Sequence, residues 1–468
     1  MGLSRLLRWP TGSSSGDSTP SAAQSRGRTG YHRHTSDSPV SVRNAIIMPD
    51  TPNAIPPSAP SASPHAAATS SAAAETPVRP LLVRFGAMGD LVLIQPMIRL
   101  LAARYGAPVD LLAAGGWVRP LYQGQPDVGE IHLLAKRKLP LWLSAEKRQL
   151  LQWLRQTGPR PVWYCDFDEK LVPLLTQAGL DERWVVRAKA VGMQDGEHLV
   201  DFSQRLARTV PPALRQVTEQ RMEVSGPHVG RPAEAAGAQT AHPAAPSRTQ
   251  ADQDDRDPNL GISATMQADV QDWLQAKGWL GKPLLLVQAG NRRTMRTGLR
   301  RRMSTNTKWW PEDNWAAIIR MLAERHPDAV ILLVGAPPEA DLNDELLQRA
   351  GVMQAFNVAR ELPIPRLLAL QARAAGMVTV DTGPAHTAAA VGCPLVVLFG
   401  VADPVRIRPR GGDTPVEVLQ AMRDGKPDMT AISVEAVVKA WQRLPLRHGA
   451  NGKAAASPGH DSMDRTSR

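Results

Sequence analysis

The turn Gly86-Ala87-Met88-Gly89-Asp90 joins a short apolar run to an amphipathic stretch, and it is the first place in the chain where a proton-transferring group stands out. Gly86 and Gly89 are free to adopt a tight turn. Asp90 falls at the N-cap or in the first turn of the helix that the pattern predicts. Its carboxylate is either a helix cap worth about 1 kcal/mol or a general base able to accept a proton from an alcohol. The residues alone leave both interpretations open.

A second loop could bind an anion. The run Asp381-Thr382-Gly383-Pro384 follows a predicted strand, and proline is well placed at the first position of a helix. Free N–H groups at a helix start favour a phosphate, and Thr382 and His386 add two donors. Asp381 would repel a phosphate, so we expect it to turn away and brace the loop. The alternative is an ordinary capped turn with His386 on the surface.

A third stretch, residues 291–311, carries seven basic residues and no acidic one. A charge run of this kind is usually a solvated loop, but its place after a strand favours binding of phosphates. Nucleic acid is a weaker fit, because aromatic residues make up only 4% of the chain and no stacking platform is evident. Trp309 and Trp310 are expected to pack. The basic patch consists of Arg292, Arg293, Arg296, Arg300, Arg301 and Arg302, with Lys308 close behind.

The order of elements predicts an α/β fold. Apolar runs of strand length alternate with stretches of helical period, which indicates parallel sheets covered on both faces. The pattern occurs twice, so we expect two Rossmann-like halves facing a central cleft, with ligands outside the carboxyl ends of the strands. The predicted strands are 80–85, 108–114, 129–135, 161–168, 283–290, 329–336, 376–380 and 394–400. The predicted helices include 91–106, 144–156, 264–278, 312–327, 363–374 and 433–444.

Composition sets the domain boundaries. Three segments are rich in Ser, Ala, Pro, Thr and Gly and show no apolar period, so they cannot bury enough surface to order themselves. We therefore predict a disordered head, a low-complexity linker and a disordered tail around two domains. Met48 is a possible alternative start, which would leave residues 1–47 untranslated. The predicted divisions are head 1–79, first domain 80–225, linker 226–260, second domain 261–445 and tail 446–468.

The net charge of +11 and a pI near 10 favour polyanionic partners. Cys165 and Cys393 lie too far apart for a disulfide framework or a metal motif, which fits a reducing compartment. No metal is expected, although Asp166-Phe167-Asp168 is a weak candidate for a divalent ion. No apolar run is long enough to span a membrane, and no secretory signal is evident. We expect a cytoplasmic protein, with peripheral contact to the anionic inner membrane.

Together these motifs resemble those of the ADP-heptose:lipopolysaccharide heptosyltransferases, glycosyltransferase family 9. The run "RFGAMGDLVLIQP" resembles the family's amino-terminal signature, and "VDTGPAHTAAAVGCPLVVLFGVADP" resembles its donor-binding signature. "KWWP" matches the Lys-x-Trp-Pro that follows the first strand of the second domain. The resemblance implies a GT-B fold and inverting transfer of a sugar, with heptose as the expected one, from a nucleoside diphosphate to a lipopolysaccharide core or related glycan, without a metal or other cofactor.

The resemblance also implies roles for individual residues. Asp90 would be the catalytic base, on a turn shaped on the acceptor side by Gly86 and Gly89. Lys308 would contact the donor diphosphate. The acid that contacts the nucleoside would lie in residues 339–348 or 358–366, with Glu361 as the weak choice. The diphosphate loop would comprise Thr382, Gly383, Pro384 and His386.

Three alternatives remain at this stage. The chain could be a non-catalytic module that binds a nucleotide sugar or phosphate, with Asp90 purely structural. It could be a basic polyanion-binding protein that acts through the arginine run. A nicotinamide-dependent oxidoreductase is disfavoured, because the glycine-rich turn lacks the dinucleotide fingerprint.

Overall fold

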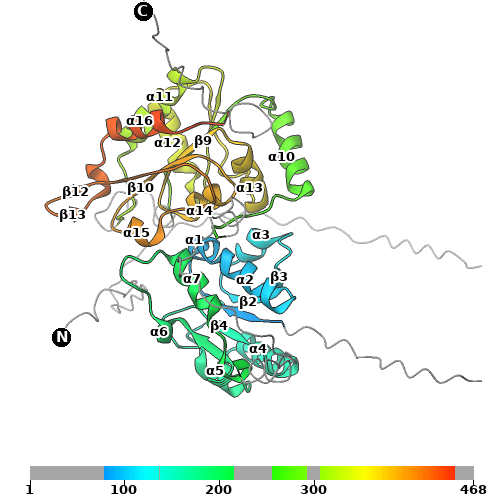
Figure 1. Cartoon of the computed structure of the whole chain (residues 1–468). Helices are drawn as coiled ribbons and strands as arrows, with labels where there is room; N and C mark the ends of the chain where they lie inside the picture. The colour runs from blue at the N-terminus through cyan, green and yellow to red at the C-terminus, as the bar shows by residue number, and fades with distance from the viewer. Residues whose placement is uncertain (1–78, 136, 216–255, 292–305, 448–468) are drawn as a thin grey trace, which may run out of the picture. The chain divides into compact units, whose positions relative to one another are not determined.

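The computed structural model describes residues 79–135, 137–215, 256–291 and 306–447 (Figure 1). All of these belong to one compact unit, Ala73–Arg468. Apart from Arg79, Leu446 and Arg447, the predicted head and tail lie outside the described residues, as do most of the predicted linker and the six arginines of the basic patch. The structure therefore does not bear on what was predicted for them.

The first half is a parallel five-stranded sheet with strand order β3-β2-β1-β4-β5. Its central strand β1 is only three residues long, and the turn of residues 84–87 follows it directly. Every strand pair is parallel. The elements are β1 (Leu81–Val83), α1 (Met88–Leu93), α2 (Gln95–Tyr105), β2 (Val109–Ala113), α3 (Val118–Tyr122), β3 (Val128–Leu133), the 3-10 turn η1 (Leu141–Leu143), α4 (Ala145–Thr157), β4 (Val162–Tyr164), α5 (Val172–Gln177), β5 (Val185–Arg187), α6 (Ala188–Val191) and α7 (Leu199–Arg208).

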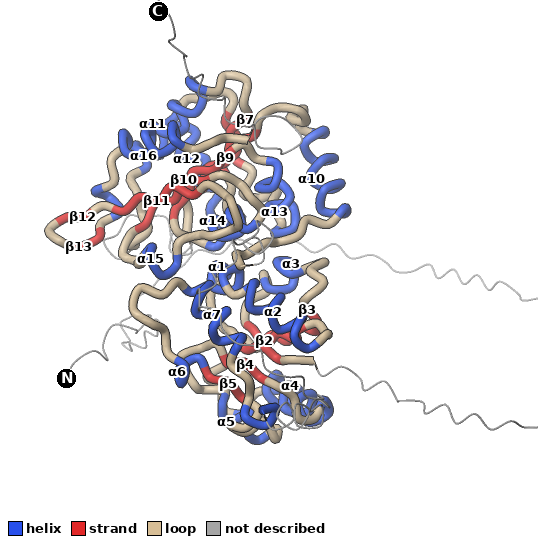
Figure 2. Tube along the Cα trace, viewed as in Figure 1, coloured by secondary structure: helices blue, strands red, loops and turns tan. Residues whose placement is uncertain are grey.

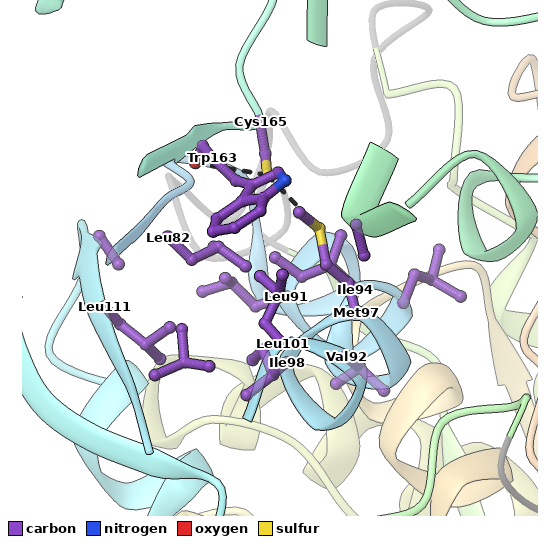
Figure 3. Packing of buried hydrophobic residues seen from close by; sticks show 14 of the residues in the cluster. Leu82, Leu91, Val92, Ile94, Met97, Ile98, Leu101, Leu111, Trp163 and Cys165 are labelled. Atoms are coloured by element: carbon purple, nitrogen blue, oxygen red, sulfur yellow. Dashed lines mark hydrogen bonds between the residues drawn. The ribbon is translucent and has the colours of Figure 1, made fainter. Parts of the chain in front are cut away.

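Alternation along the strands places side chains on both faces of this sheet. Leu82 and Trp163 pack with residues of α1, α2 and α7 on one face. Leu81 and Tyr164, one position away in each strand, pack with α4 and α5 on the other. Figure 3 shows the first of these layers, where Leu82, Trp163 and Cys165 meet the apolar side chains of α1 and α2. Burial on both faces explains why the strands read as continuous apolar runs.

The predicted helix over residues 91–106 is wrong in one detail, because the chain forms two helices there. α1 ends at Leu93, and α2 begins at Gln95. Pro96 lies in the first turn of α2, where a missing N–H costs nothing. Further inside one long helix, the same proline would remove a hydrogen bond and clash with the preceding turn. The break leaves α1 as a short separate helix, and Asp90 lies in its first turn.

The second half is a parallel six-stranded sheet of order β11-β10-β9-β6-β7-β8. Two apolar clusters cover its two faces, and Figure 2 shows its strands enclosed by helices. Its elements are α10 (Ala264–Ala276), β6 (Leu284–Gln288), α11 (Glu312–Arg325), β7 (Val330–Leu333), η3 (Pro337–Glu339), α12 (Ala340–Ala350), β8 (Ala355–Asn357), α13 (Ile364–Arg373), β9 (Gly376–Val380), α14 (Gly383–Ala390), β10 (Leu395–Phe399), α15 (Pro404–Ile407), β11 (Val416–Gln420), the hairpin β12 (Met422–Arg423) and β13 (Lys426–Pro427), η4 (Met429–Ala431) and α16 (Val434–Arg443).

The predicted α/β class with two Rossmann-like halves is thus confirmed. Contacts join the halves where α1 packs against α14. Residues 256–261 also bond to both halves. The amide of Asn259 donates to Oε1 of Gln95 in the first half (3.0 Å), and the amide of Leu260 donates to the carbonyl of Ala390 in the second (3.0 Å).

Candidate active site

Asp90 lies in the first turn of α1 with its side chain 28% exposed. The amide of Ala87 donates to Oδ2 (2.7 Å), so the carboxylate does cap its own turn. Oδ1 lies 3.2 Å from a guanidinium nitrogen of Arg84. The cap interpretation is therefore correct as far as it goes. It does not exclude a base, because a carboxylate held by an amide and a guanidinium on a partly open surface can still take a proton.

A buried ion network holds this carboxylate from behind. Arg84 bridges two acids, since one guanidinium nitrogen faces Asp90 and the other lies 3.3 Å from Oδ1 of Asp166. The amide of Phe85 donates to both oxygens of Asp166 (3.2 and 3.1 Å). Arg137 closes the network, 3.7 Å from Oδ2 of Asp166. Burial raises the pKa of Asp166 above its ordinary value, although the charge of Arg84 and the Phe85 amide oppose that rise.

The position of Asp166 explains why the Asp166-Phe167-Asp168 run resembles a metal site, but its partners show that it has another role. Asp166 is the second residue after β4, at the carboxyl edge of the sheet, as the pattern suggested. Its oxygens, however, bind Arg84 and the backbone of Phe85. Asp168 pairs with Lys170 at the surface (2.9 Å). Among the residues that the structure describes, no group of three or more His, Cys, Asp or Glu side chains could hold a metal ion.

Both glycines of the turn are required by close contacts. A Cβ at Gly86 would lie 2.5 Å from the Cβ and Oδ2 of Asp90, so any side chain there would displace the carboxylate. A Cβ at Gly89 would lie 2.4 Å from Cδ2 of His386, which belongs to the other half of the chain. The turn thus brings the backbone next to Asp90 into direct contact with the start of α14.

The diphosphate loop forms the start of α14. Its first residue is Gly383, so the helix begins one residue before the predicted position. Thr382 is the N-cap residue, but its hydroxyl donates to Oε1 of Gln288 (2.7 Å), and Thr379 donates to the same oxygen (2.8 Å). The side chain of Thr382 is therefore engaged with the protein. Pro384 has no N–H, and the amide of Ala385 donates to the carbonyl of Thr382 (3.1 Å), so an anion at this end of α14 would be met by the amides of Gly383 and His386.

Lys308 stands beside this loop. Its ammonium group lies 2.7 Å from Oδ2 of Asp381 and also donates to the Asp381 carbonyl. Asp381 is buried, as the expectation of a bracing role requires. Burial alone raises the pKa of Asp381, but its bond to His386 and the charge of Lys308 outweigh burial and lower it below the ordinary value. The acid is thus held ionised behind the loop, where it fixes Lys308.

His386 is buried, with 4% of its surface exposed, so the alternative of a surface histidine is wrong. Its Nε2 lies 3.7 Å from Oδ1 of Asp381. Its Nδ1 is buried and has no hydrogen-bond partner in the described part of the chain. Buried polar atoms without partners are rare in folded proteins, so this nitrogen is a candidate ligand contact.

Glu361, the sequence-based choice for the nucleoside, lies elsewhere. Its carboxylate accepts bonds from the indole of Trp273 (2.9 Å) and the ammonium of Lys277 (2.9 Å). These contacts lower the pKa of Glu361, the bond to Lys277 contributing most. A ligand would have to compete with both partners. The nucleoside role of Glu361 remains an untested prediction.

The sequence pointed to residues 339–348 as well as 358–366 for the nucleoside-contacting acid, but it favoured Glu361 over Glu339. The carboxylate of Glu339 follows β7 at the carboxyl edge of the second sheet, and it is only 2% exposed. Oε2 accepts from the amide of Ala336 (2.7 Å), while Oε1 is buried without a partner among the described residues. Burial raises the pKa of Glu339 to about 7. A Cβ at Gly290, the second residue after β6, would lie 2.1 Å from Oε1, so glycine makes room for this carboxylate.

The signal for Glu339 was present in the sequence. "VGAPPEADL" places an acid shortly after a buried strand, as "VDTGPAH" does. The sequence did not single out Glu339 within its stretch, because it stands among other acids that belong to the exposed face of α12. Only the fold separates Glu339 from Asp341 and Asp344, which pair with Arg360 at the surface.

Comparison with known proteins agrees with this geometry. Residues 250–419 match the model of glycosyltransferase family 9 (heptosyltransferase). Lipopolysaccharide heptosyltransferase 3 of Escherichia coli is 35% identical over 104 residues, which cover 22% of this chain and 30% of that protein. The counterpart in Escherichia coli strain K12 is 30% identical over 102 residues. The matched stretch thus spans less than a third of these curated relatives.

Solved structures extend the likeness of fold to both halves. The ADP-heptose lipopolysaccharide heptosyltransferase II of E. coli superposes with a TM-score of 0.53 at 18% identity, covering 78% of this chain and 97% of that one. A family 9 glycosyltransferase from Veillonella parvula gives a TM-score of 0.55 at 14% identity, covering 78% and 96%. An E. coli heptosyltransferase solved with ADP gives a TM-score of 0.51 at 18% identity, covering 78% of this chain and 99% of that one.

The motifs on both sides of the α1–α14 contact resemble those of the heptosyltransferases of glycosyltransferase family 9, residues 250–419 match that family's model, and the chain shares the two-domain fold of the solved GT-B heptosyltransferases.

Proposed function

We propose that the chain is an inverting glycosyltransferase that moves a heptose from ADP-heptose to a lipopolysaccharide core or a related glycan. The observation that carries this proposal is the contact of Gly89 with His386, since Asp90 and the anion-binding start of α14 flank that contact. Two structures of one E. coli heptosyltransferase support the choice of donor, because that protein was solved with ADP and with an ADP-heptose analogue. Those ligands belong to that protein, so the donor of this chain is part of the proposal.

The reaction is a single in-line displacement. An acceptor hydroxyl oxygen attacks the anomeric carbon, and the bond from that carbon to the diphosphate oxygen breaks. Asp90 takes the hydroxyl proton, and ADP leaves with the bonding electron pair. The configuration at the anomeric carbon is inverted, because attack and departure occur on opposite faces. In this scheme the protein supplies the base and the electrostatic stabilisation, without a metal ion.

The charge that grows on the departing diphosphate is met by groups on the second half. The first amides of α14 and the ammonium of Lys308 are fixed before the reaction, Lys308 by Asp381. Preorganised donors of this kind stabilise a transition state without reorganisation, and loss of one costs on the order of 3 kcal/mol in the barrier. Nδ1 of His386 is the remaining free donor or acceptor at this end of α14.

We place the nucleoside near Glu339. Its free Oε1 lies beside Gly290, on the same edge of the sheet as Gln288, which holds Thr382. A ribose hydroxyl that donates to Oε1 would supply the missing partner and favour the charged carboxylate. Glu361 is the rival candidate, and binding measurements on the two variants separate them.

We further propose that the protein acts on the cytoplasmic side of the inner membrane as a peripheral protein. No helix in the described part of the chain is long and apolar enough to cross a bilayer.

The test of the proposal is release of ADP from ADP-heptose with and without a lipopolysaccharide core acceptor. Acceptor-dependent release with a new glycosidic bond in the product, seen by mass spectrometry, supports it. Tight donor binding with no acceptor-dependent release over a panel of core acceptors would instead indicate a non-catalytic nucleotide-sugar module.

A further inference from the structure

One element of the first half presents apolar side chains to solvent. In the 3-10 turn η1, Trp142 is 74% exposed and Leu143 is 53% exposed. Every other tryptophan among the described residues is buried or half-buried. The exposed indole is therefore exceptional in this chain, and neither the proposed reaction nor the packing of the sheet uses it.

The turn is held in a defined shape. A guanidinium nitrogen of Arg148 donates to the carbonyl of Trp142 (2.7 Å). The ammonium of Lys147 donates to the carbonyls of Arg137 (2.8 Å) and Leu139 (2.6 Å). These bonds fix the backbone on both sides of the exposed side chains. Little ordering entropy is then lost when the turn meets a partner.

A groove runs beside the turn. It has a volume of about 720 Å³ and is lined on the apolar side by Leu141, Trp142 and Leu151, and on the charged side by Arg148 and Arg155. Both arginines are exposed. Apolar walls next to guanidinium groups suit a molecule with an acyl chain and an anionic headgroup.

Charge around the turn is strongly one-sided. Lys138, Arg148 and Arg155 are exposed cations. The acid packed against them is Glu146, which is half-buried and accepts from the amide of Ala135 (3.1 Å). Tryptophan favours the membrane–water interface, and basic residues near it are attracted to anionic lipid. A stable protein interface buries about 800 Å² of accessible surface on each partner, which is far more than two apolar side chains supply. A lipid surface is therefore the better fit.

We infer that the η1 turn, Trp142 and Leu143, together with the exposed cations Lys138, Arg148 and Arg155, docks the protein on the surface of an anionic phospholipid bilayer. The indole and the leucine enter the interface, and the cations meet phosphate headgroups. The purpose of this docking, which is to bring the protein to a lipid-anchored acceptor, rests on the proposed function. The docking itself does not.

The docking surface connects directly to the candidate active site. Five residues before Trp142, Arg137 lies over the ring of Phe85 at 4.7 Å and 3.7 Å from Asp166. Asp166 in turn holds Arg84, which faces Asp90. The segment therefore runs from the network behind the proposed base to the exposed turn. An acceptor anchored in the bilayer would meet the first half on the side where its hydroxyl is needed.

The test is sedimentation of the full chain with phosphatidylcholine vesicles, with and without phosphatidylglycerol. The native chain should bind the anionic vesicles in a salt-sensitive manner. The double variant Trp142→Ser/Leu143→Ser should bind roughly tenfold more weakly, and Lys138→Glu about fivefold more weakly. The matched controls, Met353→Ser for an exposed apolar side chain and Lys282→Glu for an exposed cation, should bind as the native chain does.

The inference fails if the double variant binds anionic vesicles like the native chain, since another basic segment would then be responsible. It also fails if light scattering shows a native dimer that the double variant loses, since the turn would then be a protein interface. Turnover on a water-soluble acceptor fragment should be unchanged in the double variant. Vesicle binding needs no donor, so its loss or retention is independent of whether ADP is released.

Discussion

The imidazole of His386 occupies the space into which a side chain at position 89 would project, with Cδ2 only 2.4 Å from the Cβ that Gly89 lacks. The reverse contact is almost as close, because a Cβ at Gly383 would lie 2.8 Å from Cβ of Met88. Glycine on each side lets α1 and α14 approach closely. The two motifs that the sequence suggested for chemistry are therefore in contact through Gly89 and Gly383, which are 294 residues apart (383 − 89).

Gly89→Ala should disturb this contact. A methyl group at 2.4 Å cannot be accommodated unless His386 or α1 moves, and a small misplacement of reacting groups costs about a hundredfold in rate. We expect turnover to fall at least tenfold, together with a lower melting temperature. Gly116→Ala is the matched control, because no atom lies within 4 Å of a Cβ there. Equal behaviour of the two variants would mean that the α1–α14 contact does not matter for function.

Lys308→Met should weaken ADP binding. The variant removes the cation nearest the diphosphate loop and leaves the Asp381 carboxylate buried without it. Calorimetry should show at least a tenfold loss of affinity, as expected for a charged hydrogen bond worth about 1.5–3 kcal/mol. Lys282→Met, an exposed cation of the same half, should bind ADP normally. Undiminished affinity of Lys308→Met would restrict Lys308 to holding Asp381.

Glu339→Gln should change how stability depends on pH. The folded state keeps the proton of Glu339 up to about pH 7, whereas the unfolded chain releases that proton near pH 4.5, the ordinary pKa of a glutamate. Between these values the folded state binds more protons, so the native protein loses stability as pH rises. The glutamine variant lacks this loss. From about pH 5 to about pH 8 the free energy of unfolding should shift in favour of the variant by up to about 3 kcal/mol.

The same variant tests the nucleoside site. Glu339→Gln should bind ADP at least tenfold more weakly above pH 7, where the native carboxylate is charged and accepts hydrogen bonds best. Glu361→Gln is the comparison. If that substitution weakens ADP binding while Glu339→Gln does not, the nucleoside lies near α10 and Glu339 is structural.

Asp166→Asn should lower both stability and turnover. It leaves Arg84 buried with one acid in place of two, and breaking a buried ion pair costs about 3–5 kcal/mol. Arg84 would then be drawn toward Asp90, which disturbs the orientation of the proposed base. Asp168→Asn, two residues on and paired at the surface with Lys170, should have little effect. Similar losses in both variants would revive the interpretation of this run as a metal site.

Much of the fold could be predicted from the sequence because the buried strands are continuous apolar runs. β9 was predicted with its true bounds, and the helix over residues 144–156 was predicted with its cap, since Ser144 does accept from the amide of Lys147. α7 was missed, although the Asp195-Gly196 turn precedes it and its apolar residues Leu199, Phe202 and Leu206 lie at helical spacing.

The residues of the candidate site likewise divide into those that the sequence predicts and those that it does not. Asp90, Lys308 and His386 are predictions from motifs that can be recognised in short stretches of sequence. Glu339 lay in one of the two stretches that the sequence offered for the nucleoside but was not singled out, and the Arg84–Asp166 pair was not predicted, because burial and partners on other strands give these residues their importance. No local pattern reports that Gly290 leaves room for a carboxylate 49 residues away, or that Arg84 bridges two acids.

The most direct measurement is turnover of Asp90→Asn beside its melting temperature. Asparagine keeps an oxygen for the amide of Ala87 but cannot take the acceptor proton. The proposal predicts a fall in kcat of about 10²–10⁴-fold, with ADP affinity and melting temperature nearly those of the native protein. Unimpaired turnover, or a loss of activity matched by a loss of stability, would contradict it and leave Asp90 as a helix cap alone.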